Sequence, residues 1–194
     1  MANKWKTLNS QIKFSSPFLK LVADHCAHQE NGTNHTFYRL ELRDWVNIVP
    51  ITPQGEVIMV RQYRWGCGCE TLEVPGGTLD SLEEQPLAGV KRELKEETGF
   101  DCDEIVHLGS VAVNPAMQDN HCHFFLALNV DRQGEQELDE TEDISLELIP
   151  LDKIIPLILD GTIRHSLAIQ SLLYALLSLG KTANWPQLNF TGQL

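Results

Sequence analysis

Short runs of alternating apolar and polar residues fill the first half of the chain, and this period of two is typical of β-strands. The runs cover residues 12–21, 36–42, 45–51, 57–64 and 71–74. Polar turns separate them, notably Glu30 to Asn34 and Pro53 to Glu56, and residues 66–69 read as a loop. The last of these strands ends in a turn, Pro75-Gly76-Gly77. The sequence therefore predicts a strand-rich N-terminal half.

The pattern then changes to a helical period. Pro86 suits the first turn of a helix, and Gly99 suits its C-terminal end. Leu87, Val90 and Leu94 recur at helical spacing and predict the buried stripe. A helix is therefore expected over residues 86–98.

Strands and helices alternate again in the C-terminal half. Strands are predicted over residues 108–113, 122–130 and 144–149, with Asn114-Pro115 between the first two and a polar, acidic loop over 132–141. Helices are predicted over 151–159 and 163–179, separated by Asp160-Gly161. The apolar face of the second comprises Leu167, Leu172, Leu173, Leu176 and Leu177. Residues 181–194 are expected to be a loose tail.

Composition narrows the class of protein. A length of 194 residues favours one domain with an appendage, and 42% hydrophobic residues are ordinary for a globular chain. The net charge of −12 argues against binding a nucleic-acid backbone. No apolar run approaches the roughly 20 residues that span a bilayer, and residues 1–20 lack the apolar core of a signal peptide. We expect a cytoplasmic protein without membrane or nucleic-acid partners.

The cysteines fit this location. Five are scattered along the chain, Cys26, Cys67, Cys69, Cys102 and Cys122, and an odd, irregular set indicates reduced thiols more than a disulfide framework. A zinc site built from Cys67, Cys69, Cys122, His121 and His123 is an alternative, but the spacing is not that of the common zinc motifs.

Three carboxylates define the candidate chemistry. Glu93, Glu96 and Glu97 lie at i, i+3 and i+4, which places them on one face of the predicted helix. Like charges at this spacing repel one another, and a hard divalent cation with oxygen ligands, such as Mg²⁺, resolves the conflict. The alternative is a solvated helix face on which Lys91 and Lys95 neutralise the acids.

Residues 77–100 resemble the Nudix box, G-x5-E-x7-R-E-U-x-E-E-x-G-U, where U is aliphatic or aromatic. Enzymes with this motif cut the pyrophosphate bond of nucleoside diphosphates linked to another group. The second half, from Arg92 to Phe100, matches at every fixed position. In the first half, Glu84 has the correct distance to Arg92 but lies one residue too far from Gly77, whereas Glu83 has the opposite defect. We interpret this as a one-residue insertion in the loop 78–83, because loops absorb insertions more easily than helices.

Other segments resemble the ADP-ribose pyrophosphatase branch of that family. They are Arg61-Gln62-Tyr63-Arg64, Glu73-Val74-Pro75-Gly76-Gly77, Pro115 at sixteen positions beyond Gly99, and the acidic segment Asp139 to Asp143. The resemblance implies an α/β fold, an α/β/α sandwich with a mixed sheet between helices, over residues 45–180. It also implies an N-terminal β region, residues 1–44, that mediates homodimerisation, and leaves 181–194 as a C-terminal tail.

The resemblance also assigns roles. Glu93, Glu97 and the carbonyl of Gly76 are expected to bind the metal, with Glu96 as a further or water-mediated ligand. Mg²⁺ is the expected ion and Mn²⁺ a possible substitute. Arg92 is expected to position the carboxylates by ion pairs, and Glu84 to be structural.

A general base must take the proton of the attacking water. Glu140 is the first candidate because of its place in the acidic segment, Glu142 is the second, and Glu96 is a further possibility. For the substrate, Arg64 is the favoured phosphate-binding cation, since guanidinium matches phosphate in a bidentate manner, and Arg61 lies in the same motif. Trp45 is a candidate for stacking on a base, although packing is the more ordinary role for it.

The leading hypothesis is therefore hydrolysis of ADP-ribose, or a related nucleoside diphosphate sugar, to AMP and a sugar phosphate. A second hypothesis keeps the metal site and changes the substrate to NADH, a dinucleoside polyphosphate or a coenzyme A derivative. A third is a non-catalytic Nudix-derived sensor, which the intact Arg-Glu-Glu-Glu set and the absence of a basic recognition helix disfavour.

Overall fold

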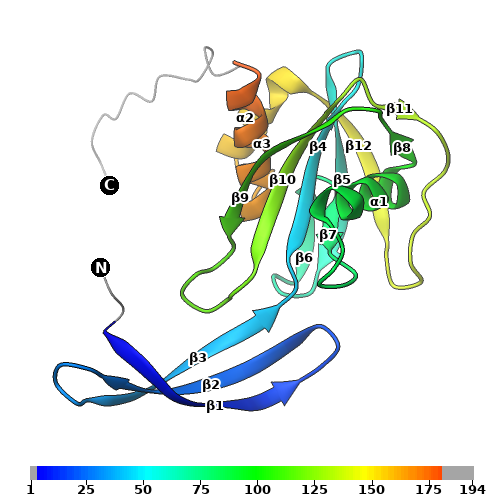
Figure 1. Cartoon of the computed structure of the whole chain (residues 1–194). Helices are drawn as coiled ribbons and strands as arrows, with labels where there is room; N and C mark the ends of the chain where they lie inside the picture. The colour runs from blue at the N-terminus through cyan, green and yellow to red at the C-terminus, as the bar shows by residue number, and fades with distance from the viewer. Residues whose placement is uncertain (1–3, 181–194) are drawn as a thin grey trace, which may run out of the picture.

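The computed structural model describes residues 4–180, which form three sheets, of three, seven and two strands. The N-terminal sheet has three antiparallel strands, β1 (Trp5–Ser15), β2 (Leu19–His28) and β3 (Asn34–Leu42), in the order β1-β2-β3. It projects away from the rest of the molecule (Figure 1), and its link to the second sheet includes an isolated bridge between Leu40 and Gln118. The N-terminal region is thus structurally distinct from the remainder of the chain.

The main sheet has seven strands. Five follow the order β12-β5-β4-β10-β9, while β6 pairs with β5 and β7 pairs with β4. Their bounds are β4 Trp45–Ile51, β5 Glu56–Arg64, β6 Cys69–Glu73, β7 Gly76–Thr78, β9 Ile105–Ala112, β10 His121–Leu128 and β12 Ile144–Pro150. Strands β4 and β10 are parallel and the other pairs are antiparallel, so the sheet is mixed.

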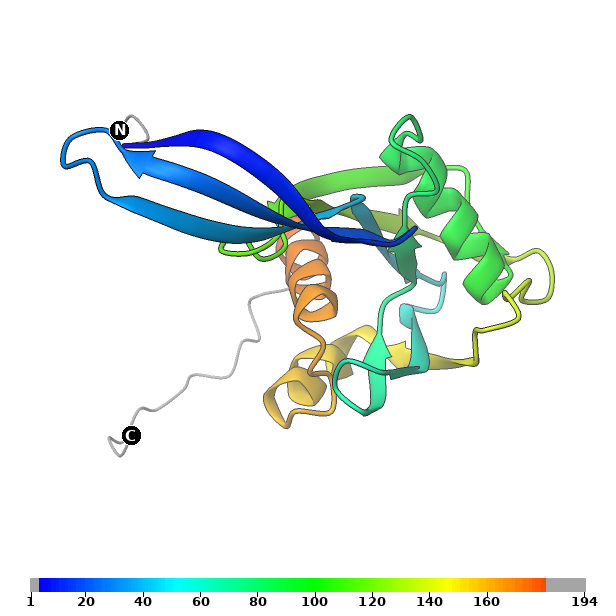
Figure 2. The same ribbon diagram turned by 90° about the horizontal axis from the view of Figure 1, so that it is seen from below.

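Helices cover both faces of this sheet. The side chains of β4 point alternately to the two faces and so contact the helices on both. Val46 and Ile48 pack toward α1 (Pro86–Thr98), whereas Val49 and Ile51 pack toward α2 (Ile154–Leu159) and α3 (Ser166–Ser178). A period of two directs successive side chains to opposite faces, so one apolar run serves two cores. Figure 2 shows α1 on one side of the strands and α3 on the other. The predicted α/β fold, with a mixed sheet between helices, is confirmed.

Several predicted strand limits were wrong. Residues 12–21 are not one strand, because Ser16-Pro17-Phe18 turns the chain between β1 and β2, and the Ser16 hydroxyl accepts hydrogen bonds from the backbone N–H groups of Phe18 and Leu19. Cys69 belongs to β6 and not to a loop. Gly76 and Gly77 continue into β7, where their backbones pair with β4.

The predicted acidic loop also contains ordered pairing. Arg132 lies in β11 (Asp131–Arg132), which pairs with β8 (Phe100–Asp101) directly after α1. The backbone N–H groups of Gln133 and Gly134 donate to the carbonyl of Gly99. The start of the segment is therefore fixed to the C-terminal end of α1.

The helices agree with prediction at α1 and differ elsewhere. α1 covers the expected residues, but Leu87 is 47% exposed, whereas Leu79 from the preceding loop is buried close to Gly89 of the helix. A 3-10 turn, η1 (Leu151–Lys153), precedes α2. α3 begins at Ser166, since the His165 side chain caps it by accepting from the N–H of Ala168.

The apolar face of α3 also differs from prediction. Leu167, Leu172 and Leu176 are buried as expected, but Leu177 is 64% exposed, because the small residues Ala168 and Ala175 complete the buried stripe. Across residues 4–180, no helix has the length and apolarity needed to cross a membrane. The predicted tail, residues 181–194, lies outside the described residues.

Candidate active site

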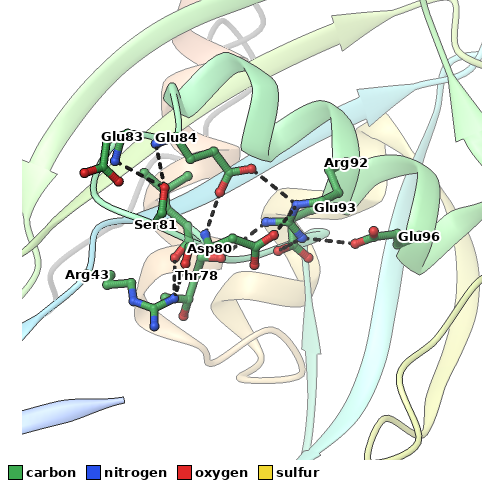
Figure 3. Close-up of polar contacts among 10 residues, drawn as sticks. Arg43, Thr78, Asp80, Ser81, Glu83, Glu84, Arg92, Glu93 and Glu96 are labelled. Carbon is green, nitrogen blue, oxygen red and sulfur yellow. Dashed lines mark hydrogen bonds and ion pairs between the residues drawn. The ribbon is translucent and has the colours of Figure 1, made fainter. Parts of the chain in front are cut away.

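Arg92 on α1 is the centre of a group of ion pairs (Figure 3). Its Nε lies 3.3 Å from both Asp80 and Glu84, and its Nη1 lies 2.9 Å from Glu93 and 3.0 Å from Glu96. One guanidinium thus contacts four carboxylates. The partners raise the pKa of Arg92 although burial opposes this, so the group stays charged. The predicted positioning role of Arg92 agrees with these contacts.

Glu84, and not Glu83, makes the contacts expected of a structural glutamate. Its Oε2 accepts a hydrogen bond of 2.5 Å from the backbone N–H of Asp80, and its Oε1 accepts from Arg92. The Ser81 hydroxyl accepts from the N–H groups of Glu83 and Glu84, which closes a tight turn. Leu82, within this turn, is exposed. Residues 78–83 thus lie before α1, which begins at Pro86.

Glycines allow β7 and α1 to approach closely. A Cβ on Gly77 would lie 2.5 Å from Oε1 of Glu93, and a Cβ on Gly76 would collide with the Val46 carbonyl. Gly76 also has a φ of +157°, which L side chains rarely adopt. The backbone of β7 thus forms a surface against which the Glu93 carboxylate lies.

Glu93 and Glu97 are buried acids whose charges are poorly compensated. Glu93 is 8% exposed, and burial raises its pKa to about 7 even though Arg92 opposes the shift. Glu97 is 3% exposed, and burial raises its pKa to about 8, against a hydrogen bond from the N–H of Gly76 to Oε2 at 2.8 Å. Repulsion from Glu142 contributes to both shifts. Two adjacent buried carboxylates of this kind favour a bound cation.

The acidic segment is attached to α1 beside these residues. The Gln136 side chain donates to the carbonyls of Glu97 and Ile144, at 2.7 and 3.1 Å, and the N–H of Glu137 donates to the Glu96 carbonyl. Farther along, the Glu142 carboxylate accepts from the N–H of Asp139 at 3.1 Å. The charge of Glu142 thus acts on Glu93 and Glu97, and both Glu140 and Glu142 are exposed.

Arg64 is held by a buried acid. Its Nε donates to Oε1 of Glu73 and its Nη2 donates to Oε2, both at 2.7 Å. Thr71 also donates to Glu73, and His165 lies 3.7 Å from it. Burial opposes the charge of Arg64, but Glu73 and, more weakly, Glu97 raise the pKa of the guanidinium. The charge of Glu97 therefore acts on Arg64, whose Nε and Nη2 are already paired with Glu73.

The other two predicted substrate contacts have different surroundings. Nε of Arg61 donates to Glu147 on β12 at 2.5 Å. Trp45 is half-buried and packs against a small core formed by Cys122, Phe124 and Leu167. Trp45 therefore has the packing role that the sequence favoured, and Arg61 takes part in a cross-strand ion pair.

The donor set fits a hard divalent cation that keeps several non-protein ligands. Within residues 4–180, no three His, Cys, Asp or Glu side chains gather into a group that could hold a metal ion. Glu93 and Glu97 nevertheless provide two buried oxygen donors with excess negative charge. Mg²⁺ takes one or two carboxylates and completes its shell with water and phosphate oxygens. The zinc alternative has less support, because Cys122 is buried beside Trp45 whereas His123 bonds to Ser110 and Asp44.

The sequence assigned no role in this region to three further residues. Glu73 was noted only as part of a motif, although a glutamate in a short apolar strand signals a buried acid in need of a partner. Gln136 joins the acidic segment to α1, but no motif or periodic pattern around it predicts this contact. Arg43 donates to the carbonyls of Leu79 and Asp80 at 3.2 and 2.5 Å, which links the end of β3 to the loop before α1 (Figure 3).

Comparison with known proteins gives consistent matches. The model of the NUDIX domain matches residues 41–172. The chain is 29% identical over 170 residues to a methanol dehydrogenase activator of Bacillus methanolicus, covering 87% of this chain and 91% of that protein. It is 30% identical to an ADP-ribose pyrophosphatase of Bacillus subtilis, covering 58% of this chain and 61% of that protein.

A second ADP-ribose pyrophosphatase, from Mycobacterium tuberculosis, is 31% identical over 66% of this chain and 62% of its own length. The chain thus spans about three fifths of each of these two enzymes. Among solved structures, an ADP compounds hydrolase superposes with a TM-score of 0.81 and 22% identity, over 94% of this chain and 98% of that one. That similarity includes the N-terminal strands and supports the fold.

Proposed function

Because the chain belongs to the NUDIX family, we propose that it is a magnesium-dependent pyrophosphohydrolase that cleaves ADP-ribose or a related nucleoside diphosphate sugar. The products would be a nucleoside monophosphate, AMP in the case of ADP-ribose, and a sugar phosphate. The observation that carries this proposal is the pair of buried carboxylates, Glu93 and Glu97, held against the backbone of β7.

Glu93, Glu97 and the carbonyl of Gly76 would hold the metal, with Glu96 as a further or water-mediated ligand. When bound, Mg²⁺ would neutralise charge on the phosphates and lower the pKa of a coordinated water. Arg92 keeps Glu93 and Glu96 in place from the side of the helix, and its contact with Glu84 fixes its own position. This arrangement orients the metal ligands before the substrate arrives.

Arg64 is positioned to recognise a phosphate. Glu73 orients the guanidinium with two hydrogen bonds, so little conformational entropy is lost when the remaining N–H donors bind an anion. The 40% exposure of the Arg64 side chain leaves it accessible. Arg61 is a weaker candidate, because the carboxylates that act on it are Glu147 and Glu70, whereas the carboxylates that act on Arg64 include Glu97 of the proposed metal site.

We infer that Glu142, rather than Glu140, is the general base, which reverses the order that the sequence suggested. The charge of Glu142 acts on both Glu93 and Glu97, and a base must lie near the water that the metal site activates. Its hydrogen bond from Asp139 holds it in the acidic segment. Substrate binding would then draw this segment toward the metal site.

A panel of substrates tests the function. ADP-ribose, GDP-mannose, NADH, a dinucleoside polyphosphate and a coenzyme A derivative are incubated with the protein and Mg²⁺, and the products are separated by ion-exchange chromatography. We expect the largest kcat/KM for ADP-ribose or another nucleoside diphosphate sugar. GDP-mannose belongs in the panel because a GDP-mannose pyrophosphatase of Klebsiella pneumoniae is 29% identical over 126 residues. No turnover of any of these compounds would overturn the proposal.

A second candidate function is activation of a partner dehydrogenase. It is favoured by the similarity to the methanol dehydrogenase activator, which extends over 87% of this chain and so reaches into the N-terminal sheet. An assay of a purified alcohol dehydrogenase with and without the protein tests it. If the Glu97→Gln variant no longer stimulates the dehydrogenase, activation depends on the proposed hydrolase site. If the natural protein does not stimulate it, this second function is excluded.

We propose in addition that the protein is a homodimer formed through its N-terminal strands. Within residues 4–180, strand β1 pairs with β2 alone, and no described strand lies along its outer edge. Leu8, Ile12 and Phe14 on this strand are all more than half exposed. An open edge with exposed apolar side chains is favourable for association.

A further inference from the structure

We propose that Cys67 and Cys69 form a redox-active dithiol, which a low-molecular-weight disulfide oxidises to a disulfide within the β5–β6 loop. The two Sγ atoms lie 3.2 Å apart, and both cysteines are free thiols in this structure. They are separated by one residue at the end of a hairpin between β5 and β6. Two thiols in contact have already lost most of the loop-closure entropy that a disulfide requires.

The backbone of the loop supports this contact. The N–H groups of Cys67 and Gly68 both donate to the carbonyl of Arg64, at 3.1 and 2.9 Å, which folds the chain back on itself. Gly68 has a φ of +65°, a left-handed conformation that suits glycine. The intervening residue therefore permits the sharp turn that brings Cys67 over Cys69.

The two thiols have different surroundings, which assigns their roles. Cys67 is exposed and accessible to a small oxidant, so it is the attacking thiol. Cys69 donates to Cys67, and this contact raises the pKa of its own thiol. A nitrogen of Arg164 lies 2.9 Å from Sγ of Cys69, where it stabilises the thiolate once Cys67 has reacted. Cys69 is accordingly the resolving thiol.

The chemistry is thiol–disulfide exchange in two steps. The Cys67 thiolate attacks one sulfur of the small disulfide, forms a mixed disulfide and releases one thiolate. The Cys69 thiolate then attacks Sγ of Cys67, forms the intraloop bond and releases the second thiolate. The two protons from the cysteines end on the two small thiols, so the protein is oxidised by two electrons and the small disulfide is reduced by two.

The other cysteines serve as internal controls. Cys26 and Cys122 are buried, and burial raises the pKa of the Cys122 thiol to about 12. Cys102 is partly exposed, and its Sγ donates to the Glu104 carbonyl, while burial raises its pKa. These thiols are less suited to exchange, so the reaction should be confined to the hairpin loop.

The loop is next to the proposed substrate cation. Sγ of Cys67 lies 3.4 Å from the carbonyl of Arg64, and Arg164 spans from Cys69 to the Glu70 carbonyl. Oxidation removes the thiol contacts at both positions and so shifts the segment that carries Arg64. The expected consequence, which rests on the proposed function, is a changed KM for the nucleoside diphosphate sugar.

The test treats the reduced full-length protein with oxidised glutathione and measures intact mass, free thiols and a peptide map. We expect loss of two hydrogens and two of the five thiols, a bond between Cys67 and Cys69, and full reversal by dithiothreitol. Cys69→Ser should instead retain a glutathione adduct on Cys67, because the resolving thiol is missing. Cys102→Ser should behave as the natural protein does.

A persistent glutathione adduct on Cys67 in the natural protein, or a bond that uses any other cysteine, would overturn the dithiol assignment. The link to the substrate site is measured separately. Oxidation should change KM at least about threefold in the natural protein and leave the KM of Cys67→Ser unchanged, because that variant lacks the attacking thiol. An unchanged KM in the oxidised protein would overturn the link. Failure of the proposed function would show as no turnover even in the reduced protein, while the mass measurement would be unaffected.

Discussion

The backbone N–H of Gly76 donates a 2.8 Å hydrogen bond to Oε2 of Glu97, and this contact joins β7 to the last turn of α1. Glu97 is thereby oriented by the backbone of the sheet, which cannot change rotamer as a lysine or arginine side chain can. This position buries the carboxylate, and burial raises its pKa strongly even though the hydrogen bond from Gly76 opposes the shift. A bound cation would compensate the buried negative charge of Glu97, so the orientation of this carboxylate is consistent with metal binding.

The close approach of Gly77 to Glu93 gives a steric prediction. Gly77→Ala places a methyl group 2.5 Å from Oε1 of Glu93, so the carboxylate must move and kcat/KM should fall by roughly 10²-fold, the scale expected for a misplaced catalytic group. Gly66→Ala is the matched control, because its Cβ meets nothing within 4 Å. Equal activity of the two variants would show that Glu93 does not need this position.

The raised pKa values of Glu93 and Glu97 predict a pH-dependent stability. Between the ordinary value of 4.5 and the raised values of about 7 and 8, the folded protein binds more protons than the unfolded chain. The free energy of unfolding of the metal-free protein therefore loses a contribution as the pH rises through this window. Glu97→Gln abolishes one such site, so its Tm relative to the natural protein should increase from about pH 5 to about pH 8.

Magnesium should act in the opposite direction. It binds the deprotonated carboxylates, so its stabilising effect on Tm should grow over the same pH range in the natural protein and be much smaller in Glu97→Gln. Thermal unfolding with and without Mg²⁺ measures both effects. A relative Tm of the variant that is independent of pH would contradict the assignment of Glu97 as a buried acid.

The identity of the base is tested by single-turnover rates. Glu142→Gln should lower the rate by about 10²–10⁴-fold, the usual scale for general acid–base catalysis, with KM within a few-fold if chemistry limits turnover. Glu140→Gln is the matched control two residues away and should be nearly as active as the natural protein. The reverse result would restore Glu140 as the base, and two active variants would leave Glu96 or the metal alone to activate the water.

The proposed dimer depends on the exposed apolar residues of β1. Phe14→Glu places a charge among them and should convert the protein to a monomer at micromolar concentration, whereas Gln11→Glu on the same strand should leave the dimer intact. Removal of residues 1–44 should likewise give a monomeric or insoluble product. Sedimentation measures the oligomeric state. A natural protein that sediments as a monomer would eliminate the proposal.

Local patterns predicted α1 and the grouping of its acids because both depend on spacing alone. The i, i+3 and i+4 positions of Glu93, Glu96 and Glu97 fix a common helix face wherever the helix packs. The exposure of Leu87 was not predictable in this way, since it depends on which distant segments pack against the first turns of the helix. Helical periodicity describes which residues share a face, but not how far that face remains covered.

Long-range partners were likewise outside the reach of the sequence. Arg64 was identified as a cation, but its bidentate pairing with Glu73 requires the register of the β5–β6 hairpin. Similarly, Glu140 and Glu142 are equivalent in the sequence, because the attachment of their segment to α1 through Gln136 is a contact between residues far apart in the chain.

Glu97 is the residue on which the proposed metal-dependent mechanism depends most directly. The decisive measurement is the single-turnover rate of ADP-ribose hydrolysis at saturating Mg²⁺, in the natural protein and in Glu97→Gln, which keeps the size of the side chain and removes its charge. Loss of metal-based charge stabilisation should lower the rate at least about a hundredfold, with AMP and ribose 5-phosphate as the products of the natural protein. If Glu97→Gln hydrolyses ADP-ribose at the natural rate, the metal site is not at Glu93 and Glu97 and the proposed mechanism is wrong.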